Sequence, residues 1–184
     1  MARNGTLVQR LRVPLGFLFA IIFLYFARPD WRWLAAGGTI AVVGLLIRAW
    51  ASGHIRKNQQ LAVSGPYAYT RNPLYVGSFV MGLGFTMAAG VWWLAILFAL
   101  LFLGIYLPVM RAESKELIDI FGAEYEEYAR RVPLFVPRPN GFRGENSLPQ
   151  SFDFQLYLRY REYRAALGVG LALTVLAAKA FFLQ

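Results

Sequence analysis

The sequence contains no cysteine and a single histidine, His54, among its 184 residues. The lack of cysteine excludes disulfides and thiolate chemistry. A zinc, haem or di-iron centre would need more nitrogen or sulfur ligands than the chain offers, so we expect no metal site. Acidic residues are also scarce: 10 Asp and Glu stand against 19 Lys and Arg, which gives a formal net charge of +9.

Apolar side chains, in contrast, are abundant. They make up 58% of the residues, and the mean hydropathy is +0.44. This composition is too apolar for an ordinary soluble domain, so we expect an all-α integral membrane protein with one domain over residues 1–184. In such a chain the positive charge indicates attraction to anionic lipid headgroups, and no nucleic-acid partner is expected.

Five apolar segments could cross a membrane, where a span needs roughly 20 residues and at least about 17. The first segment is the shortest and the least certain. The third and fourth are separated only by a tiny turn at Ala89-Gly90, which predicts an antiparallel hairpin. The expected spans are approximately residues 13–27, 31–51, 73–89, 91–110 and 165–182.

The distribution of positive charge predicts an orientation. Sixteen of the nineteen cations lie before the first segment, between the second and third (counting Arg48), or between the fourth and fifth. The positive-inside rule places these regions and the N-terminus in the cytoplasm, and the C-terminus on the opposite side of an inner or plasma membrane. Segments three to five carry almost no ionisable residue at mid-membrane, which disfavours a transporter.

A turn-rich stretch, GPYAYTRNPLYVG, occupies residues 65–77 and runs into the third segment. Gly65-Pro66 is a turn signal. At Asn72-Pro73 the pattern predicts a helix start, with Asn as the cap and Pro at the first helical position. The planar cation and phenol rings between these signals could form a pocket for an anionic, aromatic cofactor. Taken alone, however, Tyr67, Tyr69 and Arg71 favour a simple anchor at the membrane interface, where such residues are common.

A second motif follows the fourth segment; it begins at Glu113 and ends in Val132-Pro133-x-Phe135-x-Pro137. The residues from Arg111 to Arg131 have a helical pattern with an expected break at Gly122. Glu113 lies on one helix face with apolar and aromatic residues and would need a partner there, which for a purely structural acid would be Arg71 or Arg111. The other members of that face are Leu117, Phe121, Tyr125 and Tyr128.

Together these two motifs resemble the integral-membrane methyltransferases that use S-adenosylmethionine, a superfamily that includes isoprenylcysteine carboxyl methyltransferases and phospholipid N-methyltransferases. The resemblance covers roughly residues 52–137. The family's usual Arg-His-Pro-x-Tyr is represented by Arg71-Asn72-Pro73-Leu74-Tyr75, and its paired acids by Glu113-Ser114. Asn72 cannot titrate near neutral pH as histidine does, which excludes general-base catalysis at this position.

The resemblance implies a cytoplasmic S-adenosylmethionine pocket, formed by the loop and the helix that follow segments two and four. It implies catalytic roles for Arg71, Glu113 and Arg111. The family's carboxyl methyltransferases bind the substrate carboxylate with an arginine one helical turn before the acid. That position is Val109 in this chain, and Arg111 is the nearest cation to it in sequence. An ordinary loop is an equal alternative for residues 59–62. The cofactor contacts implied by the resemblance are Gln59, Gln60, Leu61, Ala62, Tyr67, Arg71, Asn72, Pro73, Tyr75 and Glu113.

The implied reaction is methylation of a lipophilic, membrane-embedded acceptor, either an isoprenylcysteine-type carboxylate or a lipid amine. An NADPH-dependent membrane reductase of the sterol-reductase type and a non-enzymatic protein that binds lipid or a partner are the alternatives. We expect His54 and Lys57 to be solvated at the surface. Residues 138–164 are expected to form a polar loop and, from Phe152 to Arg164, an interfacial helix that the resemblance leaves unexplained.

Overall fold

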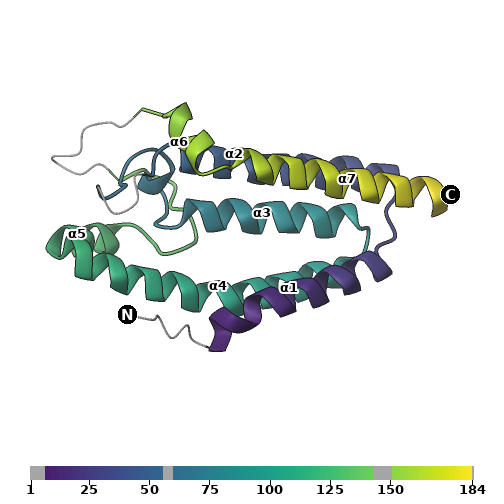
Figure 1. The fold of residues 1–184 in the computed structure, drawn as a ribbon, viewed down its shortest axis with the longest axis horizontal. Helices are drawn as coiled ribbons and strands as arrows, with labels where there is room; N and C mark the ends of the chain where they lie inside the picture. The colour runs from purple at the N-terminus through teal and green to yellow at the C-terminus, as the bar shows by residue number, and fades with distance from the viewer. Residues whose placement is uncertain (1–6, 56–59, 143–150, 184) are drawn as a thin grey trace.

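The computed structural model describes residues 7–55, 60–142 and 151–183, which form helices joined by turns and loops (Figure 1). The expected all-α class is therefore confirmed for this part of the chain. In chain order the elements are α1 (Leu7–Phe26), α2 (Trp31–Ser52), the 3-10 helix η1 (Gly65–Ala68), α3 (Pro73–Ala88), α4 (Trp92–Phe121), α5 (Ala123–Arg131), α6 (Phe154–Arg159) and α7 (Tyr163–Leu183).

Among the described residues, three helices are long and apolar enough to cross a membrane, namely α2, α4 and α7. The apolar part of α1, Val13–Phe26, and the whole of α3 are shorter. The 16 residues of α3 extend about 24 Å, which is less than the ~30 Å hydrocarbon core. The number of five spans therefore stays a prediction.

The expected fourth span, 91–110, and the helical pattern expected from Arg111 belong to one helix. The 30 residues of α4 are continuous from Trp92 to Phe121 and extend about 45 Å, so α4 is longer than the hydrocarbon core is thick. The predicted break at Gly122 is confirmed: its φ of +54° suits glycine and separates α4 from α5.

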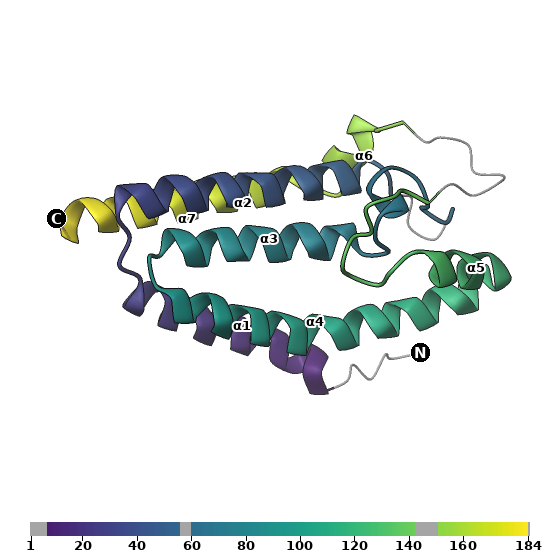
Figure 2. The ribbon, with the colours of Figure 1, turned by 180° about the vertical axis from the view of Figure 1, so that it is seen from behind.

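The long helices lie side by side, and the small elements gather at one end of them (Figures 1 and 2). α3 packs between α2 and α4, α7 packs against α2, and α1 packs against α4. The loop with η1, the helix α5 and the helix α6 lie at one end, whereas the α1–α2 and α3–α4 connections lie at the other. Both motifs therefore lie at the same end of the described part of the chain.

Glycine allows α2 and α3 to approach each other closely. A Cβ atom on Gly37 would lie 2.4 Å from the carbonyl oxygen of Gly84, and one on Gly44 would lie 2.6 Å from that of Gly77. Both approaches are closer than any side chain permits, so the backbones themselves are in contact. Small residues are the usual means by which helices associate in lipid, where packing drives the association.

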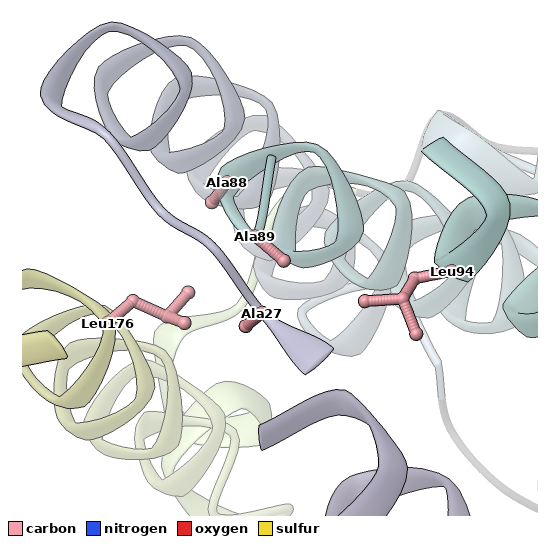
Figure 3. Close-up of a cluster of buried hydrophobic side chains, with 5 residues drawn as sticks. All are labelled: Ala27, Ala88, Ala89, Leu94 and Leu176. Atoms are coloured by element: carbon pink, nitrogen blue, oxygen red, sulfur yellow. The ribbon is translucent and has the colours of Figure 1, made fainter. Parts of the chain in front are cut away.

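At the end away from the motifs, buried apolar side chains join three helices and the turn after α1 (Figure 3). The backbone N–H of Arg28 donates to the carbonyl oxygen of Ala89 at 2.7 Å, which ties this turn to the α3–α4 hairpin. The hairpin and α2 are thereby anchored to each other at this end. The buried residues of the cluster are Ala27, Ala88, Ala89, Leu94 and Leu176.

We predict that Gly44→Ala destabilises the protein by about 1–3 kcal/mol, because the new methyl group would overlap backbone atoms of α3. Gly104→Ala is the matched control, since a Cβ there meets nothing within 4 Å. Both changes raise helix propensity equally, so thermal unfolding in the same detergent isolates the packing effect. Equal melting temperatures would contradict the close approach of α2 and α3.

Candidate active site

Backbone hydrogen bonds join the two motifs. The N–H of Arg71 donates to the carbonyl oxygen of Pro133 at 3.0 Å, and the N–H of Arg138 donates to that of Tyr69 at 3.0 Å. A third bond runs from the N–H of Phe142 to the carbonyl oxygen of Ala68 at 2.8 Å. The bonded backbone groups lie in loops or at the end of η1, so no helix supplies partners for them. The three bonds supply those partners, and they also hold the segment after α5 against the loop before α3.

Asn72 occupies the N-cap position of α3 and Pro73 its first helical position, as predicted. The expected capping bond is wrong, however, because the Asn72 side chain makes no hydrogen bond to the helix. Its Nδ2 instead donates to the carbonyl oxygen of Leu134 at 3.0 Å. The amide side chain therefore joins the two motifs, and the neighbouring Thr70 hydroxyl does the same by donating to Phe135 at 3.0 Å.

Glu113 lies half-buried on α4, where the Tyr75 hydroxyl donates to its Oε1 at 2.9 Å. The partner of this acid is thus a phenol on α3. The ion pair expected with Arg71 or Arg111 is therefore wrong. Because the bond joins α3 to α4, it places one acidic and one phenolic group of the two motifs next to each other.

Arg71 reaches the aromatic face of α5. Its Nη1 donates to the Tyr125 hydroxyl at 3.4 Å, and its guanidinium carbon lies 5.9 Å from the centre of that ring. The Tyr125 hydroxyl donates in turn to the Ser114 Oγ at 2.9 Å. A guanidinium held over a phenol ring in this way still has other N–H groups that can bind a further partner.

The predicted inward face of the second motif is confirmed by a buried cluster of Tyr125, Tyr128 and Val132. The Tyr128 hydroxyl donates to the carbonyl oxygen of Tyr67 at 2.7 Å, which anchors η1 to α5. Burial raises the pKa of Tyr128, so this phenol stays protonated and continues to donate. Packed against the cluster are Leu61, Val63, Leu117, Phe121, Ala129 and Phe142.

Three buried polar side-chain atoms in the described part of the chain have no hydrogen-bond partner. They are the Ser64 Oγ, the Tyr67 hydroxyl and the Arg71 Nε, and all three belong to the loop between α2 and α3. Burial, together with the negative charges of Glu162 and Glu113 and the nearby Tyr160, raises the pKa of Tyr67. The Tyr67 phenol therefore remains protonated at neutral pH and can donate a hydrogen bond.

The remaining predicted cofactor contacts lie around this loop. Leu61 and Ala62 are half-buried and Gln60 is exposed, whereas Gln59 lies outside the described residues. Arg111 is exposed on α4. In the described ranges no group of three or more His, Asp or Glu side chains is placed to hold a metal ion.

The expected surface position of His54 is wrong, because only 6% of this residue is exposed. Its Nδ1 lies 2.9 Å from the carbonyl oxygen of Trp50, and the Phe152 ring packs against the imidazole. A segment far along the chain thus covers the histidine, and a local pattern could not reveal that cover. Lys57 lies outside the described residues.

One polar pair near the site was missed by the motif analysis. Arg48 on α2 forms an ion pair with Glu162, at 2.8 Å from its Nη2 to Oε1. The available signal was the position of Arg48 on the same helix face as Gly37, Ala41 and Gly44, which contacts α3 rather than lipid.

The apolar helices are those of an integral membrane protein. The polar end, where two distant motifs meet and Tyr75 pairs with Glu113, is its candidate site. The phospholipid methyltransferase family model matches residues 39–124, which include η1, α3 and the whole of α4. The chain belongs to this superfamily of membrane methyltransferases, which also includes the isoprenylcysteine methyltransferases.

Several curated proteins are similar to the chain. The cobalt-zinc-cadmium resistance protein CzcN of Cupriavidus metallidurans is 37% identical over 148 residues, which cover 74% of this chain and 66% of that protein. A protein-S-isoprenylcysteine O-methyltransferase of Schizosaccharomyces pombe is 30% identical over 135 residues, which cover 71% of this chain and 57% of the enzyme.

A methanethiol S-methyltransferase of Crocosphaera subtropica is 37% identical over 71 residues, which cover 39% of this chain and 27% of that protein. The chain thus spans about two thirds or less of the length of these three relatives. No solved structure matches the chain.

We predict that Asn72→Asp lowers stability at least as much as Asn72→Ala does. An aspartate would cap a helix as well as asparagine, but it would place a second acceptor against the Leu134 carbonyl oxygen. Loss of the bond in Asn72→Ala should cost about 0.5–1.5 kcal/mol. Thermal unfolding of the three proteins measures both effects. An aspartate variant as stable as the wild type would contradict the role of the Leu134 bond and indicate that Asn72 acts as a helix cap.

Proposed function

We propose that this protein is an S-adenosylmethionine-dependent methyltransferase that acts on a lipophilic acceptor in the membrane. The observation that supports this most strongly is the set of three unpartnered buried atoms on Ser64, Tyr67 and Arg71. Each unsatisfied group costs about 1–3 kcal/mol, a cost that a polar ligand would remove by supplying the missing partners. These atoms lie on the loop that the second motif holds in place through Tyr128 and Pro133.

The polar groups of the site fit the chemistry of S-adenosylmethionine, which carries a carboxylate, an ammonium, ribose hydroxyls and an adenine. The unpartnered Nε of Arg71 suits the carboxylate, since guanidinium–carboxylate bonds are among the stronger hydrogen bonds. The carboxylate of Glu113 suits the ammonium or the ribose hydroxyls. The hydroxyls of Tyr67 and Ser64 would bond the remaining ribose or adenine atoms, and Gln60, Leu61 and Ala62 would lie along the adenosine.

When bound, this cofactor supplies a sulfonium methyl carbon, to which the acceptor's lone pair bonds as the carbon–sulfur bond breaks with its electron pair left on sulfur. The residues of the chain act by binding and orienting. Tyr75 fixes the Glu113 carboxylate, and Asn72 and Pro73 set the start of α3. A thiol or amine acceptor also releases one proton to solvent, and the Asn72 amide cannot take it up. Positioning of the two reactants would provide most of the rate enhancement.

The acceptor is proposed to be lipophilic because α2, α4 and α7 present apolar surfaces to the membrane in which it would dissolve. Relatives named for the methylation of isoprenylcysteine and of methanethiol support a carboxylate or a thiol as the nucleophile, and a lipid amine is the third class. For a carboxylate acceptor, Arg111 is the proposed cation, because it is the one nearest in sequence to Val109, which is buried and apolar. The excess of cations in the segments at the site end supports a cytoplasmic site in an inner or plasma membrane.

We predict that adenosylhomocysteine raises the melting temperature of the detergent-solubilised protein. A ligand at 100 times its dissociation constant adds about 2.7 kcal/mol to the free energy of unfolding. NADPH at the same concentration is the control and should produce no shift. Stabilisation by NADPH alone would indicate a reductase, and the absence of any shift with millimolar adenosylhomocysteine or S-adenosylmethionine would reject the cofactor. Mass analysis of a lipid extract incubated with labelled cofactor then identifies the acceptor.

We predict that Glu113→Gln weakens adenosylhomocysteine binding at least tenfold, whereas Glu116→Gln changes it less than twofold. The two acids lie on one helix, but Glu113 is half-buried beside Tyr75 and Glu116 is exposed. A neutral amide keeps the size of the side chain and removes the charge that would bind the ammonium. Isothermal titration calorimetry compares the two variants, and equal losses of affinity would show that the position of Glu113 has no special role.

A further inference from the structure

The imidazole of His54 closes the end of α2. In a continuing α-helix the backbone N–H of His54 would donate to the carbonyl oxygen of Trp50, four residues earlier. It donates instead to that of Ala51 at 3.1 Å, and the His54 Nδ1 lies 2.9 Å from the Trp50 carbonyl oxygen. A carbonyl oxygen only accepts, so Nδ1 carries a proton and donates. This bond and the edge-on Trp50 ring, centred 6.2 Å away, fix the orientation of the imidazole.

The residues before α6 cover this imidazole. The Phe152 ring is centred 6.2 Å from the His54 ring, and the N–H of Asp153 donates to the carbonyl oxygen of Gly53 at 2.9 Å. A Cβ on Gly53 would lie 2.3 Å from the Phe152 ring, so the contact needs glycine beside the histidine. This segment of the chain, which lies beyond residues 39–124 that match the family, is thereby docked onto His54.

The imidazole also touches the turn at which η1 begins. A Cβ built on Gly65 would lie 2.6 Å from both Nε2 and Cδ2 of His54, so the ring occupies the place of the missing side chain. Gly65 has a φ of +58°, which by itself favours glycine, and the imidazole gives a second, independent reason for it. The backbone of the turn therefore rests directly against the ring.

Gly65 lies between two residues whose buried hydroxyls have no hydrogen-bond partner in the described part of the chain, Ser64 and Tyr67. The N–H of Tyr67 donates to the carbonyl oxygen of Ser64 at 3.1 Å, which closes the turn around Gly65. The Tyr128 hydroxyl holds the Tyr67 carbonyl oxygen at 2.7 Å from the side of α5. A movement at Gly65 would displace both hydroxyls, and the His54 ring blocks such a movement.

We propose that His54 is a positioning residue of the active site, which sets the turn at Gly65 so that the Ser64 and Tyr67 hydroxyls meet the bound cofactor. This inference rests on the proposed function, because it takes the ligand of the two hydroxyls to be S-adenosylmethionine. Phe152 acts through His54 by holding the imidazole against the turn. The segment before α6 thereby contributes to cofactor binding without touching the cofactor.

Two double-mutant cycles on adenosylhomocysteine affinity, measured by calorimetry on the whole chain, test the inference. His54→Ala should raise the dissociation constant about fivefold, as expected when one hydrogen bond to the ligand is displaced. In a Ser64→Ala/Tyr67→Phe background it should add less than about twofold, because the groups through which it acts are gone. In a Glu113→Gln background both hydroxyls remain, so the loss of about fivefold should persist.

A purely structural histidine would give a different result. His54→Ala would then lower the melting temperature and leave the affinity of the folded protein at the wild-type value, which would overturn the inference. Equal effects of His54→Ala in the wild type and in the Ser64→Ala/Tyr67→Phe background would overturn it as well.

A second pair of variants decides the case in which His54→Ala fails to fold. Phe152 is 45% exposed, and Phe152→Ala uncovers the imidazole while its bond to Trp50 stays in place. The dissociation constant should rise about threefold, because a less confined turn is less well preorganised for the ligand. Phe154→Ala is the matched control and should leave the affinity unchanged, since this ring is 60% exposed and stacks on Tyr157.

Equal affinities of the Phe152→Ala and Phe154→Ala variants would overturn the inference alone. Absence of adenosylhomocysteine binding by the wild type would overturn the proposed function and the inference with it.

Discussion

The structure depends on the backbone contact between α2 and α3. Gly37 and Gly44 on one helix face Gly84 and Gly77 on the other, with atoms closer than any Cβ would permit. Lipid offers no hydrophobic gain for helix association, so this contact relies on close packing and on the hydrogen bond from Arg48 of α2 to Ser78 of α3. It fixes both ends of the loop that contains η1, because this loop runs from the end of α2 to the start of α3. It also places Arg48, one turn beyond Gly44 on the same face, in the protein interior, where a carboxylate is available to it.

The site itself is built from irregular backbone held by hydrogen bonds between distant segments. Near a membrane such backbone is tolerated only where each polar group finds a partner within the protein. Pro133, Leu134 and Phe135 provide three of these partners through their carbonyl oxygens. Among these bonded groups, the atoms of Ser64, Tyr67 and Arg71 that have no partner are the place where we propose that the ligand binds. Exclusion of water there would strengthen each electrostatic contact with it.

Much of this arrangement follows from the sequence because it is local. Hydrophobic runs predicted the long helices, and glycine and proline predicted the break at Gly122 and the start of α3. The side-chain partners of Asn72 and Glu113, in contrast, come from segments more than thirty-five positions away, and no local pattern specifies them. The burial of His54 was missed for the same reason.

The α3–α4 hairpin has a geometric consequence for the site. Its two helices are joined at Ala89-Gly90, and the contact between Tyr75 and Glu113 lies near the far end of α3, about 20 Å away. Over that length each degree of splay between the helices displaces the two groups by roughly 0.35 Å. Two degrees would lengthen the 2.9 Å bond to about 3.6 Å, a distance at which it is no longer a hydrogen bond. Since helix tilt responds to bilayer thickness, the separation of acid and phenol becomes a property of the membrane as well as of the chain.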